Sequence, residues 1–295
     1  MSRFPWFGGR AIIGSLLLLA ALCLGGCSSI RLAYGNASQL AWWWIDGYVD
    51  FSREQAPQIK DGLDRFAEWH RRTQLPEWLP LLAAAQAQIT EPTTPELACR
   101  WQAQVRDKLE PTLQRALSLA ADALPGLAEA QFRHIEQKYA KGNAEMRRDF
   151  LQDDAEERLD RAVKRTLERV EQVYGRVGEA QKKLVREGVA ASPFSPELWL
   201  AERQRRQRDV LATLRRLAAE KADSEQRLAA LQQLVQRMER STDPAYRAYQ
   251  LKLADYNCAF AARIHNGTTP AQRLKARETL KGWEDDLRSF VPVPG

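Results

Sequence analysis

The sequence has few of the residues that interrupt helices, and this scarcity points to an all-α protein. Its 295 residues include 16 glycines and 14 prolines. The alternation of polar and apolar residues that marks β-strands is nearly absent. Leu, Ala, Arg, Gln and Glu dominate instead, and these residues favour helices. A chain of this length can bury the core of one or two such domains.

The sequence also lacks the motifs by which many enzymes and metal sites are recognised. It has no G-x-S-x-G, no phosphate-binding glycine loop and no H-E-x-x-H. Its three histidines, His70, His134 and His265, are not spaced as metal ligands. His265-Asn266-Gly267 fits the end of a helix, where a cation and a glycine are both favourable. We therefore expect a protein that is not an enzyme and that holds no metal and no cofactor.

One pair of carboxylates keeps an enzymatic alternative open. Asp46 and Asp50 are four residues apart, so a helix places them on one face, as a hydrolase with an acid and a base requires. Neither has a partner base nearby in the sequence. We prefer a structural interpretation, in which Asp50 serves the start of the next helix and Asp46 accepts an indole or phenol hydrogen.

The first 26 residues have the pattern of a signal peptide. Two arginines precede an apolar run from Ala11 to Leu24, which is short for a bilayer span. With the Gly-Gly-Cys that follows, Leu24 completes a motif that resembles the lipobox of bacterial lipoproteins. The resemblance implies cleavage before Cys27, acylation of its sulfur atom, and a short tether over residues 27–37. An ordinary signal peptide with a chance cysteine is the alternative.

The residues after Cys27 indicate where such an anchor resides. Two serines follow it, with no aspartate, which resembles lipoproteins sorted to the outer membrane. An acylated cysteine anchors stably, because each buried methylene contributes roughly 0.8 kcal/mol. We expect a lipid-anchored protein on the periplasmic face of the bacterial outer membrane, with an envelope protein as partner. Export argues against nucleic acid as the partner of the basic run at 203–208, although the net charge of +6 favours anionic partners.

Two cysteines remain in the mature body, Cys99 and Cys258. In an oxidising periplasm such a pair is most simply a disulfide. It would tie the start of the body to its end across a long loop, which is worth around 5 kcal/mol in the chain-entropy model. Two buried free thiols are the alternative. A metal or catalytic role is disfavoured, because neither cysteine has a nearby histidine or a C-x-x-C partner.

Capping residues divide the chain into about eight helices. Apolar residues alternate in steps of three and four from Leu159 to Leu184 and from Val210 to Met238, which predicts a long antiparallel coiled-coil hairpin over 143–241. Each arm, of about 45 residues, would reach roughly 65 Å. The helices of 38–142 and 242–295 should pack together as the body. Whether the two seams pair within one chain or recruit a second copy, and hence the oligomeric state, stays open.

The stretch AWWWIDGYVDF at 41–51 is apolar nearly all round a helix, so it must be buried or lie in an interface. We expect burial in the body. Trp42, Trp43, Trp44 and Tyr48 are nevertheless the candidate binding surface, because tryptophans also favour the membrane interface. Membrane contact and binding of a client protein therefore stay open.

Two further resemblances bear on function. The stretches WWWIDGYVDFSREQ and YNCAFAARIHNGTTPAQRLKARETLKGWEDDLRSF resemble the start and end of a family of uncharacterised proteobacterial lipoproteins, a domain of unknown function. More weakly, Ser52-x-x-Gln55 and Thr269-x-x-Gln272 resemble the L-T-x-x-Q helix starts of periplasmic helical chaperones, although the same residues suit an ordinary capping box. We expect a structural, adaptor or scaffold role through helical surfaces, with a periplasmic chaperone or an amphiphile-binding protein as the alternative.

Overall fold

The computed structural model describes residues 29–220 and 222–291. All regular structure within these residues is helical, which confirms the predicted all-α class. The predicted signal peptide over 1–26 and the acylation site at Cys27 lie outside the described residues, so both stay predictions.

The described chain consists of helices joined by short loops. In order, they are α2 (Ser29–Gly35), α3 (Ala37–Val49), α4 (Ala56–Trp69), the π-helical turn η1 (His70–Gln74), α5 (Leu75–Gln88), α6 (Pro95–Ala123), the 3-10 turn η2 (Leu124–Gly126), α7 (Glu129–Phe150), α8 (Ala155–Tyr174), α9 (Glu179–Ala190), α10 (Pro196–Ala219), α11 (Ser224–Glu239), α12 (Pro244–Asn266) and α13 (Pro270–Arg288). Capping residues that the sequence marks as helix starts do cap these helices. Thr94, Ser195, Asp243 and Thr269 each accept a backbone hydrogen bond from the first turn that follows.

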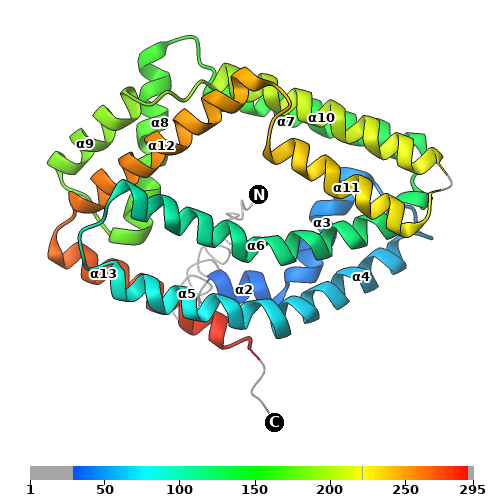
Figure 1. Ribbon diagram of the computed structural model, residues 1–295, viewed down its shortest axis with the longest axis horizontal. Coiled ribbons are helices and arrows are strands. Elements are labelled where there is room, and N and C mark those ends of the chain that lie inside the picture. The colour runs from blue at the N-terminus through cyan, green and yellow to red at the C-terminus, as the bar shows by residue number, and fades with distance from the viewer. Residues whose placement is uncertain (1–28, 221, 292–295) are drawn as a thin grey trace, which may run out of the picture.

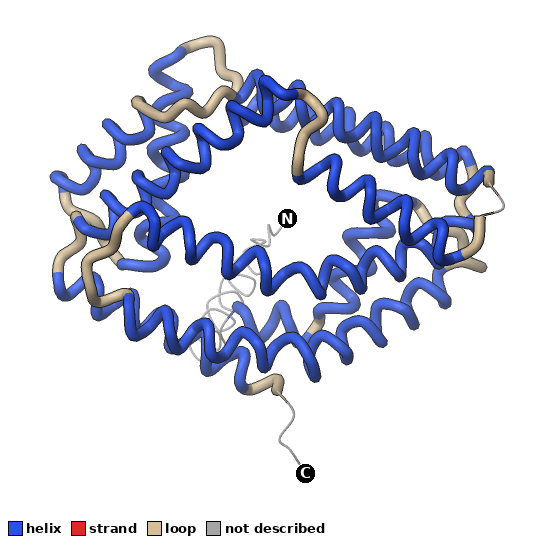
Figure 2. The backbone as a smooth tube through the Cα atoms, viewed as in Figure 1, coloured by secondary structure: helices blue, strands red, loops and turns tan. Residues whose placement is uncertain are grey.

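The helices follow the outline of a flat, elongated ring (Figure 1), and Figure 2 shows the same path as a tube. One end of the ring holds α8, α9 and α13, and the other holds α3, α4 and α7. Between the ends, α6 packs against α12 and α11. Elements far apart in the sequence are thus neighbours in space, so the ring is closed by long-range contacts.

The two halves of the chain repeat one arrangement. In the first half, α3 packs on α4 and α7, and α4 contacts α6; in the second, α8 packs on α9 and α13, and α9 contacts α12. The halves also interlock, because α5 packs on α13 and α10 packs on α7. Helices α3, α4, α5, α6 and α7 therefore correspond to α8, α9, α10, α12 and α13. Helix α11, which packs on α6, has no counterpart in the first half.

The structure does not contain the predicted coiled-coil hairpin over 143–241. The first expected arm is divided by loops at 151–154 and 175–178, and the second by one near residue 220. Gly175, with a φ of 74°, follows the end of α8 in a left-handed conformation that a helix cannot continue through. The pieces pack on other partners: α8 on α9 and α13, and α10 on α7 and α11. The apolar seams are therefore buried within the ring and form no projecting arm.

The core is distributed around the ring in small clusters. The largest sits where α6, α10 and α11 meet, and its fully buried members include Ala121, Leu217 and Leu231. A second cluster joins α7 to α10 through Phe132, which is 3% exposed, and its neighbours. Since no single cluster spans the molecule, contacts between helices at many points must hold the ring together.

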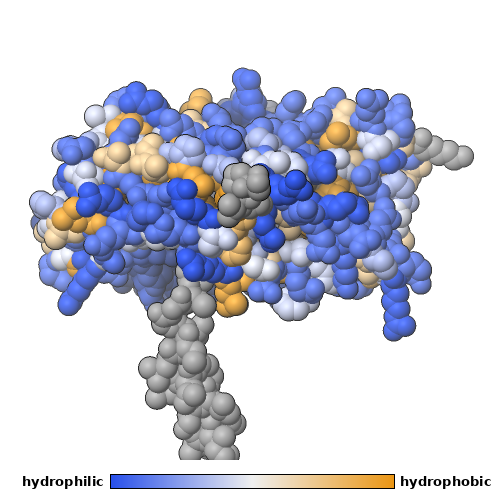
Figure 3. Space-filling model, turned by 90° about the horizontal axis from the view of Figure 1, so that it is seen from below, coloured by the Kyte–Doolittle hydropathy of each residue, from blue (hydrophilic) through white to orange (hydrophobic). Residues whose placement is uncertain are grey.

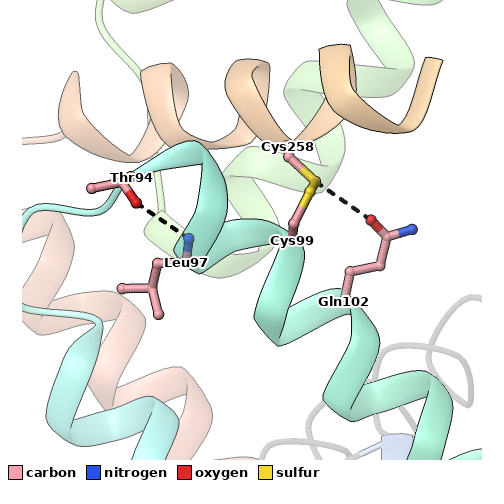
Figure 4. Close-up of a disulfide and its surroundings, with 5 residues drawn as sticks. All are labelled: Thr94, Leu97, Cys99, Gln102 and Cys258. Atoms are coloured by element: carbon pink, nitrogen blue, oxygen red, sulfur yellow. Dashed lines mark hydrogen bonds between the residues drawn. A yellow bond between two sulfur atoms is a disulfide. The ribbon is translucent and has the colours of Figure 1, made fainter. Parts of the chain in front are cut away.

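The predicted disulfide is present and lies at the crossing of α6 and α12 (Figure 4). Cys99 and Cys258 are joined with their Cα atoms 5.3 Å apart. Gln102 Oε1 lies 3.7 Å from Cys258 Sγ, a van der Waals contact, since a disulfide sulfur has no proton to donate. Because α6 and α12 belong to different halves, the disulfide joins the two repeats.

Candidate functional site

The first half of the ring encloses an apolar cavity of about 600 Å³. Its walls come from α3, α4 and α6, with η2 and α10 closing one end. Most of the lining side chains are hydrocarbon or aromatic, among them Ala41, Ile45, Leu63, Phe66, Leu119 and Leu214, while Ser38, Gln58, Arg65, His70, Thr112 and Asp122 are polar. A cavity of this size suits an apolar ligand, because hydrocarbon and aromatic groups make up most of its walls.

A few polar groups gather near Tyr34 and His70, on α2 and η1. The Tyr34 hydroxyl lies 2.8 Å from Nδ1 of His70. Burial raises the pKa of Tyr34 and lowers the pKa of His70, so both side chains are neutral at pH 7. The Thr112 hydroxyl is also buried in the lining, without a hydrogen-bond partner among the described residues. The cavity thus offers a small neutral polar group beside a long apolar wall.

The predicted tryptophan surface divides between core and solvent. Trp42 is buried at 8% exposure, stacked on Phe51 and covered by the Lys60 ammonium 4.7 Å above its ring. Trp43 and Trp44 are exposed, at 62% and 67%. The expectation of burial therefore holds for only one of the three tryptophans.

The exposed tryptophans lie beside the cavity. Trp44 lines it and contacts Tyr48, at 5.0 Å between ring centroids, so it stands at the cavity rim. Leu40, one turn before Trp44, is exposed as well. None of the described helices is both long and apolar enough to cross a membrane. In Figure 3, which views the ring from below, the surface is mostly hydrophilic with small separate hydrophobic patches.

The two candidate acidic residues serve the end of α3. An Asp46 carboxylate oxygen accepts a hydrogen bond from the Phe51 backbone N–H at 3.1 Å. Asp50 has a φ of 59°, and its backbone N–H bonds the Asp46 carbonyl at 2.8 Å. Both residues thus take part in the turn that ends the helix, which supplies a structural reason for their spacing.

The three histidines of the sequence, His70, His134 and His265, lie apart, and each has different hydrogen-bond partners. His134 bonds the Gly47 carbonyl at 3.2 Å. His265 Nε2 lies 2.7 Å from the Glu91 carbonyl and its Nδ1 lies 2.8 Å from the Tyr174 hydroxyl. Within 29–220 and 222–291, no cluster of His, Cys, Asp and Glu is arranged to hold a metal ion.

A second cavity, of about 820 Å³, occupies the second half of the ring between α8, α9 and α12. These helices correspond to α3, α4 and α6, so the two cavities occupy equivalent places in the repeat. Gly62 on α4 and Gly188 on α9 occupy corresponding helices, and the residue after each lines a cavity: Leu63 lines the first and Val189 the second. Unlike the first cavity, the second is lined by three arginines, Arg158, Arg165 and Arg169.

Each end of the ring is closed by a reciprocal pair of glutamines. At one end, Gln131 Nε2 donates to the Asp50 carbonyl at 3.2 Å, while Gln55 Nε2 donates to the Gly126 carbonyl. The two side chains also bond each other at 2.9 Å. Each glutamine caps its own helix through its Oε1, which accepts the N–H of Ser52 or of Ala128. We call this arrangement the first glutamine pair.

The second glutamine pair repeats the first at the other end. Gln181 Nε2 donates to the Gly267 carbonyl at 2.9 Å, and Gln272 Nε2 donates to the Arg176 carbonyl at 2.9 Å. The two side chains bond each other at 2.7 Å. In both pairs, therefore, each glutamine ties its own helix start to the loop before its partner.

Sequence reasoning found only half of these residues. It marked Gln55 and Gln272, but it missed Gln131 and Gln181, which Ala128 and Gly178 precede in place of Ser or Thr. A signal was present for Gln181: the segments QAPQIKDGL and QKKLVREGV, which begin at Gln55 and Gln181, both place glycine seven residues after glutamine. These glycines, Gly62 and Gly188, face α6 and α12, where an added Cβ would meet Leu119 and Phe260.

The fold and its sites define a class of helical protein: a closed ring made of two interlocked repeats, each holding a cavity and closed by a glutamine pair. The chain belongs to DUF6279, a family of unknown function, whose model matches residues 47–247. The predicted membership of a family of unknown function is thereby confirmed. Neither a curated protein nor a solved structure matches the chain.

Proposed function

We propose that this protein is a lipid-anchored envelope protein without enzymatic activity, which binds the apolar chain of an amphiphile in its first cavity. The observation that carries this proposal is the 600 Å³ space between α3, α4 and α6, with its apolar walls. The scaffold role expected of a projecting coiled-coil arm has no such arm to support it, whereas the amphiphile-binding alternative has a cavity.

The polarity of the cavity favours a ligand with a small uncharged polar head. Tyr34 and His70 form a neutral pair. The Thr112 hydroxyl has no hydrogen-bond partner among the described residues, so it can bond a ligand. The charged residues of the lining, Arg65 and Asp122, are opposite in sign and both exposed, so they supply no net countercharge to an ionised head, whose desolvation is costly. A monoacylglycerol or a fatty alcohol meets these requirements: its hydroxyls would bond Thr112 while its chain covers the apolar wall.

The surface around the rim supports delivery from a membrane. Trp43, Trp44 and Leu40 are exposed on α3, shortly after the predicted acylation site at Cys27. Tryptophan side chains favour the headgroup region of a bilayer. An anchor at Cys27 would hold the rim near the outer membrane, so an amphiphile could enter the cavity without crossing water.

A chaperone for unfolded periplasmic proteins is the second candidate. Two reciprocal glutamine pairs, built on four helix starts, extend the resemblance to L-T-x-x-Q chaperones that Gln55 and Gln272 already carry. This role predicts that the protein suppresses aggregation of an unfolded client at near-stoichiometric ratios. Suppression that survives blocking of the first cavity would favour the chaperone over the amphiphile-binding protein.

The test uses the full-length protein in phosphatidylcholine nanodiscs with a photoreactive monoacylglycerol, whose attachment sites are mapped by mass spectrometry. We expect attachment to peptides of α3, α4 and α6. Ala120→Phe, which places a ring inside the cavity, should remove most of this labelling. Ala84→Phe is the matched control, because Ala84 is exposed on α5 and lines neither cavity.

Labelling spread evenly over the surface, or equal in the two variants, would contradict the proposal. The same mass spectra of the native product test the anchor: a mature chain that starts at Cys27 and carries acyl groups is expected. An unmodified Cys27 would remove the membrane part of the proposal and leave the cavity part intact.

A further inference from the structure

The second cavity combines clustered cations with an apolar floor. Arg158, Arg165 and Arg169 all lie on α8, whereas Glu197 is the single acidic residue in the lining. Arg158 forms an ion pair with Glu197, with Nη1 3.1 Å from Oε1. The charges of the other two arginines are therefore not balanced by the lining.

Arg165 is held in place by groups that form no ion pair with it, although the charges of Asp149 and Glu168 are near. Its Nη1 donates to the Asp149 carbonyl at 3.1 Å, and its guanidinium lies 4.2 Å over the Phe150 ring. Burial lowers the pKa of Arg165, and the neighbouring charge of Arg169 lowers it further. An arginine so crowded still stays protonated, so an added anion would relieve this repulsion.

Arg169, one turn further along α8, forms no ion pair and no hydrogen bond with any residue in the described parts of the chain. Its side chain is exposed and lines the cavity beside Arg165. Two guanidinium groups on successive turns of one helix form a fork that suits a phosphate or carboxylate group, whose oxygens can accept several hydrogen bonds.

Much of the remaining wall is hydrocarbon and aromatic, with polar side chains of Thr166, Ser192, Ser195 and Asn257 also present. Its apolar part includes Phe150, Leu159, Phe194, Leu253 and Phe260. A free inorganic anion would leave this surface unused, while a wholly apolar ligand would leave Arg165 and Arg169 without a partner. The cavity therefore matches a ligand that carries both an anionic group and an apolar chain.

We propose that the second cavity is a separate binding site for an anionic single-chain amphiphile, whose phosphate or carboxylate group is bound by Arg165 and Arg169. Its apolar chain lies along the floor formed by α12 and the loop before α10. This site is independent of the first cavity, which holds uncharged ligands. The protein thus has two ligand sites in equivalent places of its repeat, one for uncharged and one for anionic amphiphiles.

The experiment uses the full-length protein in phosphatidylcholine nanodiscs with two photoreactive probes of equal chain length, dodecyl phosphate and dodecanol. Dodecyl phosphate should attach to peptides of α8 and α12, and dodecanol to those of α3 and α4. Arg165→Gln and Arg169→Gln should each reduce attachment of dodecyl phosphate at α8 roughly tenfold or more, since each removes a charge-assisted hydrogen bond.

Arg161→Gln is the matched control. Arg161 lies on the same helix but pairs with Glu157, 2.7 Å from Nη2 to Oε1, and does not line the cavity. Its replacement should leave the labelling unchanged. Circular dichroism and thermal unfolding check that each variant folds. If Arg165→Gln does not fold, Arg169→Gln still provides the test, because Arg169 is exposed.

Three results would overturn the proposal. Labelling that is equal in Arg161→Gln and Arg169→Gln would remove the role of the arginines. Attachment of dodecyl phosphate only to α3 and α4 would assign it to the first cavity. Complete displacement by millimolar inorganic phosphate would show that the apolar floor contributes nothing. Ala120→Phe, by contrast, should leave dodecyl phosphate labelling at α8 unchanged. The proposal for the second cavity is therefore tested separately from the proposal for the first.

Discussion

The two halves of the ring share a framework and differ in the chemistry of their cavities. Gly62 and Gly188, each seven residues after a paired glutamine, allow α4 and α9 to approach α6 and α12. Yet α3 presents Ala41 and Ile45 to one cavity where α8 presents arginines to the other. A repeated backbone arrangement therefore fixes where a cavity forms, while a few side chains on one helix decide what it binds.

The largest test of this comparison is to separate the halves at their crossing. Replacing both cysteines, Cys99→Ser with Cys258→Ser, should lower the free energy of unfolding by about 5 kcal/mol, because the disulfide closes a separation of 159 residues. Denaturation by guanidinium chloride, with and without a reductant, measures this difference. A loss below about 1 kcal/mol would mean that packing alone holds the repeats together.

The paired glycines test whether the two repeats pack equally tightly. An added Cβ at Gly188 would overlap the Phe260 ring, whereas at Gly62 it would lie 3.1 Å from the flexible end of Leu119. Gly188→Ala should cost about 2 kcal/mol, because a buried ring must shift. Gly62→Ala should be nearly neutral, since the better helix propensity of alanine offsets a mild contact. Equal unfolding midpoints for the two variants would contradict this asymmetry.

The glutamine pairs test whether the two ends are equally strong. Gln131 is 7% exposed, whereas Gln272 is only half-buried. Gln131→Ala should cost roughly 1.5 kcal/mol, since it removes part-buried hydrogen bonds to the Ala128 N–H, the Asp50 carbonyl and Gln55, and Gln272→Ala should cost less. Urea denaturation measures both, and a double variant with Gln55 gives the coupling energy of the first pair. A larger loss at Gln272 would reverse the predicted order.

The smallest expected effect is a pH dependence centred on His265. Its Nε2 donates to the Glu91 carbonyl, so Nδ1 of the neutral ring accepts from Tyr174. Burial lowers the pKa of His265, and burial raises the pKa of Tyr174 to about 12. The unfolded state therefore binds the histidine proton more readily, so stability is full above about pH 6.5 and falls as the pH drops below it.

Thermal unfolding between pH 8 and pH 5 checks this sign. His265→Gln should flatten the dependence without abolishing it, because His70 bonds Tyr34 through the same ring nitrogen in the other half and its pKa is lowered as well. A melting temperature that rises on acidification would contradict the assignment of neutral histidines to the folded state.

Local signals in the sequence predicted much of the secondary structure. Thr94, Ser195 and Thr269 begin helices as expected, because capping is a matter of a few adjacent residues. The disulfide was also predictable, since it follows from counting cysteines. The hairpin was not, because a heptad seam states that one face is buried without naming the partner. Helix α10 in fact packs on α7, most of which precedes the expected hairpin, and on α11, the next helix of the same expected arm.

Prediction of the candidate site was weaker for a related reason. The tryptophan stretch was located, but its division into buried Trp42 and exposed Trp43 and Trp44 depends on which helices surround α3. The cavities themselves have no sequence signature, because their walls are ordinary apolar helix faces. The arginines of α8 look like a solvated face until α9 and α12 are placed beside them.

The sequence by itself determined that this chain is helical, where most of its helices begin, and which two cysteines are joined. These features depend on residues close in the chain or on composition, and they survive any change of topology. Only the tertiary structure decided that the helices close into a ring of two repeats, because helix faces of similar hydrophobicity can pair in many ways. The loops at 151–154 and 175–178 redirect the chain and select one of them, and with it the positions of both cavities.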